Sequence, residues 1–267
     1  MTNRIVRFLF ILIFPFCSLY AENNETKHDI LYTNLAGAAL IAGWGIANWD
    51  YGKISPHKSN EGWFGSQTKY GGADKVGHFY ATYLFGFGLS ELYESLGYTE
   101  KDAALYGSLS SFFLMNAMEI GDAFSPEQGF SYEDCIVNTL GSLTSYLFAS
   151  NPELSKRIDF RIEYIPSFKT ADVVTEYEKT KYLIALKSEG FDFISNPMLK
   201  YTELQLGYYT RNYENGFSDE SERILYLGIG INLSKVARES GYDKTAVFLN
   251  YYQIPYTYIA HENDLNK

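Results

Sequence analysis

Apolar residues run in four helix-length stretches through the first half of this chain. The stretches are residues 30–49, 74–96, 100–123 and 131–149. After Pro152 the pattern changes to the alternation of apolar and polar positions that is typical of strands. Strand-like segments lie at residues 158–165, 181–186, 201–209, 224–233 and 246–251. The pattern predicts an α+β fold, with an N-terminal, membrane-associated bundle of about four apolar helices followed by a small antiparallel β unit.

The first residues have the features of a secretory signal peptide. Arg4 and Arg7 precede a short apolar core, and Leu19-Tyr20-Ala21 offers a cleavage site. We therefore divide the chain into a signal peptide (1–21), a helical bundle domain (22–152) and a β-rich C-terminal region (153–267). A retained N-terminal anchor is the alternative, although the apolar run is short for a span.

The two cysteines give information on the cellular compartment of the protein. If the signal peptide is removed, Cys17 goes with it and only Cys135 remains, so no intrachain disulfide can form. The preceding Phe14-Pro15-Phe16 makes Cys17 a poor lipid-attachment site. An exported protein without disulfides favours a bacterial envelope, and we expect the periplasm or outer membrane of a Gram-negative-type bacterium.

Residues 30–49 carry no charge and are rich in Ala and Gly, which makes them the best membrane-helix candidate. The uncharged parts of the other three helices span only about 15 to 18 residues, which is short for a full crossing. These helices could cross a thin bilayer, lie partly embedded, or form a water-soluble bundle.

Amino-acid composition and net charge restrict the classes of partner that the protein can bind. Aromatic residues make up 17% of the chain, with 24 Tyr and 19 Phe, which fits either aromatic girdles at a membrane interface or a tyrosine-rich β surface. The net charge of −10 excludes a nucleic-acid surface and polybasic membrane docking.

Three polar clusters interrupt the apolar helices, and the first contains Asp74, Lys75 and His78. Asp74 and His78 are four residues apart and so share a helix face. In the functional interpretation His78 is a base, ligand or proton carrier that Asp74 orients, and Lys75 binds an anion. In the structural interpretation Asp74 caps the helix and His78 is a satisfied core residue.

The second and third clusters lie at a helix end and at a helix start. Glu119 and Asp122 are close to a helix C-terminus, where the helix dipole disfavours acids, so they need a partner or solvent. Asp134, Asn138 and Gly141 form one polar stripe on the last helix. Ser131 with Asp134 resembles a capping box, which accounts for Asp134 but not for Asn138. Costly charges in three nearby segments predict one shared polar site.

Established catalytic and cofactor signatures are missing from the sequence. It has no Gly-x-Ser-x-Gly elbow, Walker loop, His-Glu-x-x-His or Cys-x-x-Cys, and only four His. We expect no cofactor and no metal. The alternative is a carboxylate site for Ca²⁺ or Mg²⁺ built from Glu119, Asp122 and Asp134.

The order of these clusters resembles a known family. Asp74-Lys75-x-x-His78, then Glu119, then Asp134-x-x-x-Asn138-x-x-Gly141 is similar to the VanZ-like membrane domain. The signal peptide and the segment 71–79 bring the chain closer to the YfiM-type predicted periplasmic lipoproteins. This resemblance covers about residues 34–150 and implies an envelope location and a helical fold without an assigned activity. The VanZ-like likeness implies lipid or peptidoglycan precursors as the context.

We therefore expect a cell-envelope protein of unknown activity that binds a lipid or another envelope component, with an envelope protein as a further partner. The alternative is a hydrolase or transferase acting on a lipid-linked phosphate or polar head group. In that reading Lys75 binds the anion, and His78 with Glu119 performs acid–base work. A third interpretation is that His78, Glu119 and Asn138 only hold the bundle together.

Overall fold

A computed structural model describes residues 28–165, 176–213 and 216–267. The expected signal peptide lies outside the described residues. The chain divides into two compact units, and each is described by itself below. The helical unit comprises residues 28–60 and 81–150. The sheet unit comprises residues 61–80 together with the described residues from 151 onward.

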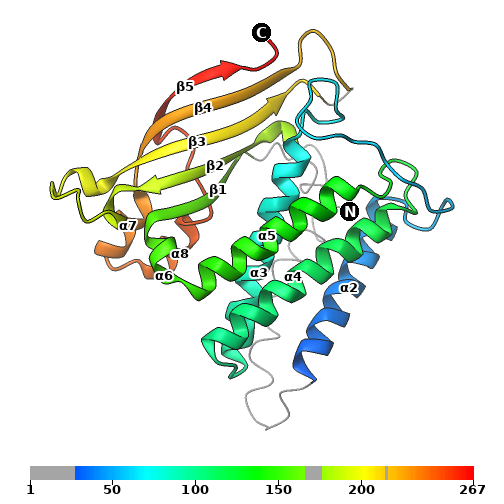
Figure 1. The fold of residues 1–267 in the computed structure, drawn as a ribbon, viewed down its shortest axis with the longest axis horizontal. Coiled ribbons are helices and arrows are strands. Elements are labelled where there is room, and N and C mark those ends of the chain that lie inside the picture. The colour runs from blue at the N-terminus through cyan, green and yellow to red at the C-terminus, as the bar shows by residue number, and fades with distance from the viewer. Residues whose placement is uncertain (1–27, 166–175, 214–215) are drawn as a thin grey trace, which may run out of the picture. The chain divides into compact units, whose positions relative to one another are not determined.

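Four long helices occupy the first half of the chain, as the apolar pattern predicts (Figure 1). They are α2 (Asp29–Asn48), α3 (Ala73–Ser95), α4 (Glu100–Asp122) and α5 (Tyr132–Ser150). Their starts follow from local side chains. The Thr99 hydroxyl accepts from the Asp102 amide at 3.2 Å, and the Ser131 hydroxyl accepts from the Asp134 amide at 3.2 Å. Each hydroxyl satisfies a helix N–H that has no partner within its helix.

Small residues set the distances between helices in the helical unit. A Cβ added to Gly107 on α4 would lie 2.8 Å from the Ser90 Cα of α3. A Cβ on Gly86 of α3 would lie 2.3 Å from the Ser145 Oγ of α5. Such close backbone approach is typical of helices that pack in membranes.

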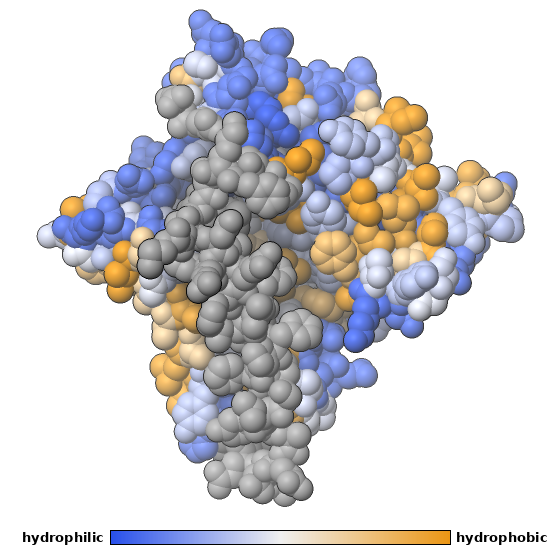
Figure 2. All heavy atoms as spheres, turned by 180° about the vertical axis from the view of Figure 1, so that it is seen from behind, coloured by the Kyte–Doolittle hydropathy of each residue, from blue (hydrophilic) through white to orange (hydrophobic). Residues whose placement is uncertain are grey.

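The helical unit buries many polar residues and exposes many large apolar residues. On α4 and α5 the buried positions include Ser108, Ser111, Glu119, Asp134, Asn138 and Ser145. The exposed large apolar residues of the same two helices are Leu105, Leu109, Phe112, Phe113, Ile120, Ile136, Leu140, Leu143 and Leu147. Figure 2 shows one face of the molecule, on which hydrophobic residues (orange) gather in patches. This distribution is the reverse of that in a water-soluble bundle.

Judged by length and composition, α2 is the one helix among the described residues that could cross a membrane. Only 6% of its most apolar 18-residue window is buried.

The sheet unit contains five antiparallel strands in the order β1-β2-β3-β4-β5 (Figure 1). They are β1 (Ile158–Tyr164), β2 (Thr180–Lys187), β3 (Thr202–Arg211), β4 (Glu222–Ile231) and β5 (Tyr258–Asp264). Tyr226 fills part of the inner face, and a Cβ on Gly207 opposite it would lie 2.2 Å from its ring. Gly207 is therefore needed to make room for the tyrosine. The predicted α+β fold is confirmed.

One predicted strand is wrong. Residues 246–251 were expected to be extended, but α8 (Asp243–Leu249) occupies most of that range after the short α7 (Leu233–Glu239). The short apolar run there fits either element, and the buried residues Ala246 and Leu249 are three apart, which is helical spacing. A third short helix, α6 (Pro152–Arg157), leads from α5 into β1.

The true fifth strand, β5, was missed because its sequence does not alternate between apolar and polar residues. Its inward positions include Glu262 and Asp264. The chain just before it lies along the free edge of β1. The Ile162 amide donates to the Tyr251 carbonyl at 3.0 Å, and the Gln253 amide donates to the Ile162 carbonyl at 2.9 Å. This pairing covers an edge that would otherwise be open.

Replacing Gly107 tests the close helix packing. We expect Gly107→Ala to lower the free energy of unfolding by about 1–3 kcal/mol, because the new methyl group would clash with the Ser90 backbone. Gly88→Ala is the matched control, since a Cβ there meets nothing within 4 Å. It should be neutral or stabilising by up to about 1 kcal/mol. Chemical denaturation followed by circular dichroism measures both, and equal stability of the two variants would contradict the packing.

Candidate functional site

Four of the polar residues expected from the sequence gather in the helical unit, at the end of α4 and the start of α5. Glu119 and Asp122 lie on the last turns of α4, and Asp134 and Asn138 lie on the first two turns of α5. All four side chains are buried. Buried carboxylates are costly unless they are hydrogen-bonded, paired or protonated, so the partners of each decide its state.

Asp122 is held by Tyr51, which the sequence analysis did not identify. The Tyr51 hydroxyl donates to Asp122 Oδ1 at 2.6 Å and to the Met118 carbonyl at 3.2 Å. Its ring lies against Gly45 of α2 and Gly121 of α4, and a Cβ on either would lie within 2.3 Å of a ring atom. Burial, and then the negative charges of Asp122 and Glu119, raise the pKa of the Tyr51 phenol. Tyr51 therefore stays a neutral donor to Asp122.

Glu119 connects α4 to the loop before α5. The Ser131 amide donates to Glu119 Oε2 at 3.4 Å, while the Ser131 hydroxyl caps α5. This serine therefore links the second and third sequence clusters. The expected capping role of Ser131 is confirmed, and its backbone contact with Glu119 could not be read from spacing.

Asn138 is fully buried a turn deeper than Asp134. Its Oδ1 accepts from the Thr82 hydroxyl of α3 at 2.9 Å. Its amide Nδ2 is buried without a hydrogen-bond partner among the described residues. An unsatisfied buried donor is costly, and it marks a place where a polar group of a ligand or a water would be stabilised.

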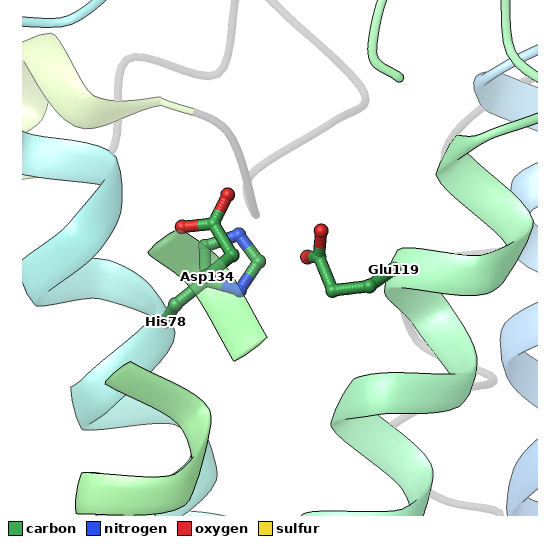
Figure 3. Close-up of side chains that lie close together, drawn as sticks. All are labelled: His78, Glu119 and Asp134. Atoms are coloured by element: carbon green, nitrogen blue, oxygen red, sulfur yellow. The ribbon is translucent and has the colours of Figure 1, made fainter. Parts of the chain in front are cut away.

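His78 lies on the part of α3 that belongs to the sheet unit, whereas Glu119 and Asp134 belong to the helical unit. Figure 3 draws the side chains of these three residues. An imidazole or a carboxylate can accept and return a proton, and either can bind a metal ion.

Lys75 and Asp74 make a different set of contacts, within the sheet unit. The buried Lys75 ammonium lies 2.5 Å from a carboxylate oxygen of Glu61 and 2.8 Å from one of Asp74. These two carboxylates neutralise its charge. An anionic ligand at Lys75 would therefore compete with Glu61 and Asp74, and Glu61 is another residue that the sequence analysis did not identify.

Among known proteins, one family model matches residues 60–150 of the chain, and it is described as "Predicted periplasmic lipoprotein (DUF2279)". Comparison with curated proteins and with solved structures found no match to either. The matched residues include all three polar clusters. The match supports an exported, cell-envelope protein of unknown activity.

The contact between Tyr51 and Asp122 can be tested by removing one hydroxyl. We expect Tyr51→Phe to lower the free energy of unfolding by about 1–3 kcal/mol, because the buried Asp122 carboxylate loses a donor. Tyr32→Phe on α2 is the control, since Tyr32 is 59% exposed and should change stability by less than about 0.5 kcal/mol. A Tyr51→Phe protein as stable as the control would mean that solvent satisfies Asp122.

Proposed function

We propose that this is a membrane-associated envelope protein whose helical unit contacts lipid and binds a lipid or another envelope component through its buried polar cluster. One observation carries the first part. Helices α4 and α5 bury Ser, Glu, Asp and Asn and expose Leu, Ile and Phe. In water this arrangement would leave large apolar side chains in contact with solvent, whereas in a bilayer it places them against acyl chains.

The second part rests on Asn138, Glu119 and Asp134. A buried amide donor beside buried carboxylates favours a ligand that presents hydroxyl, amine or amide groups. Head groups of lipids and of lipid-linked precursors have such groups. The resemblance of the three clusters to the VanZ-like domain, which implies lipid or peptidoglycan precursors as the context, supports this class of ligand.

Fractionation of cells tests the membrane association. We expect the native protein to sediment with membranes, to resist extraction by high salt, and to require detergent for release. The double variant Leu109→Lys/Leu143→Lys should shift the protein towards the soluble fraction, because both positions are more than half exposed on the apolar surface. Glu91→Lys is the matched control on an exposed polar position and should not shift. Recovery of the native protein in the soluble periplasmic fraction would contradict the proposal.

Acid–base catalysis on a lipid-linked phosphate or polar head group is the second candidate. The presence of His78 and of the buried carboxylates Glu119 and Asp134 favours it, since an imidazole and a carboxylate can each accept and return a proton. The ion pairs of Lys75 count against an anion-binding role unless substrate displaces Glu61 or Asp74.

A single preparation separates binding from catalysis and from a structural role. We expect mass spectrometry of the native protein in mild detergent to find one lipid class enriched over the bulk membrane. Glu119→Gln should lose this enrichment with little change in melting temperature, whereas the exposed control Glu91→Gln keeps it. Phosphate release from a lipid diphosphate by the native protein and not by His78→Ala would favour catalysis instead. Unchanged enrichment in Glu119→Gln would leave the cluster a structural role.

A further inference from the structure

The sheet unit buries a set of charged side chains on one face and exposes large apolar side chains on the other, and the exposed apolar side chains define a second surface. Side chains alternate between the two faces of each strand. The inward face holds a set of buried charged residues, namely Asp159, Arg161, Glu163, Lys187 and Glu203. In a water-soluble sheet the charged residues face the solvent and the apolar residues are buried, which is the opposite arrangement.

The buried charges are paired with one another. Arg161 lies 2.5 Å from Asp159 and 2.7 Å from Glu203, and Lys187 lies 2.7 Å from the other oxygen of Asp159. Gln253 accepts from Arg161 at 3.0 Å. The buried ion pairs fix the strand register that exposes the apolar side chains, because shifting a strand by one residue would break this network.

The outward face carries apolar side chains in register across neighbouring strands. Leu206 pairs with Leu227, and Ile229 pairs with Leu204 on one side and Ile259 on the other. The exposed members of this face are Ile184, Leu186, Leu204, Leu206, Leu225, Leu227, Ile229, Ile231 and Ile259. Ile229 is 64% exposed and Ile259 is 86% exposed. A continuous apolar surface of this kind marks an interaction site.

One end of the outward face is already covered within the sheet unit. Phe64 contacts Tyr208 with ring centroids 5.7 Å apart, and Phe79 contacts Phe160 at 5.2 Å. The exposed leucines and isoleucines continue this apolar interface along the strands. The sheet therefore uses part of the face for its own packing and leaves the rest for another apolar surface.

We propose that the exposed outward face of the β-sheet binds the acyl chains of membrane lipids. Its charge pattern matches hydrocarbon, since Arg223, near the start of β4, is the one charged residue at an outward strand position among the described residues. A protein partner would instead need polar rims and hydrogen bonds, which rows of leucine and isoleucine do not provide. Outward apolar and inward polar alternation is the pattern of lipid-facing strands.

A fluorescent probe on the full chain tests this contact. In a Cys17→Ser/Cys135→Ser background, an environment-sensitive dye is attached to Ile229→Cys, or to Glu220→Cys as the control on an exposed polar position. In phosphatidylethanolamine–phosphatidylglycerol vesicles, we expect a blue shift and quenching by acyl-chain nitroxides at position 229 and neither at position 220. The double variant Leu227→Lys/Ile229→Lys should weaken vesicle binding about tenfold or more, and Glu220→Lys should not.

The outcomes separate this proposal from the one on the helical unit. Absence of quenching at position 229 in a protein that still sediments with membranes would overturn the sheet proposal alone. Quenching at position 229 would support it even if Leu109→Lys/Leu143→Lys leaves fractionation unchanged. A blue shift that depends on protein concentration without vesicles would assign the face to a second copy of the chain and overturn lipid binding.

Discussion

The structure depends on one constraint, which is that charged side chains turned inward must find partners there. Arg161 lies between Asp159 and Glu203, and Tyr51 donates to Asp122. An unpartnered buried charge would cost far more than any single apolar contact contributes. Because these groups occupy part of the interior of both units, many large apolar side chains lie on the outside.

The exposed apolar side chains indicate the environment in which the protein is found. Water-soluble proteins expose scattered apolar residues, but rows of leucine, isoleucine and phenylalanine on helix and strand faces need a hydrocarbon or protein partner. The match of residues 60–150 to a family described as predicted periplasmic lipoproteins supports an envelope location. The exposed apolar faces and the family match are independent observations, and both are consistent with a protein of the cell envelope.

The polar cluster is the place where chemistry would occur if the protein has any. It has two buried carboxylates, Glu119 and Asp134, and the buried amide donor of Asn138, and these groups come from α4 and α5. The same groups can bind a head group, relay a proton, or hold helices together.

Sequence alone was enough for the four helices, four of the five strands and the capping role of Ser131, because periodicity and capping are local. It also singled out Glu119, Asp122, Asp134 and Asn138, which the structure shows to be buried, since a polar residue in an apolar helix stands out. Tertiary structure decided that Tyr51 and Thr82 bond to them, that α8 replaces a predicted strand, and that β5 completes the sheet. It alone showed which face of each element is buried, because alternation separates two faces without stating which one is inside.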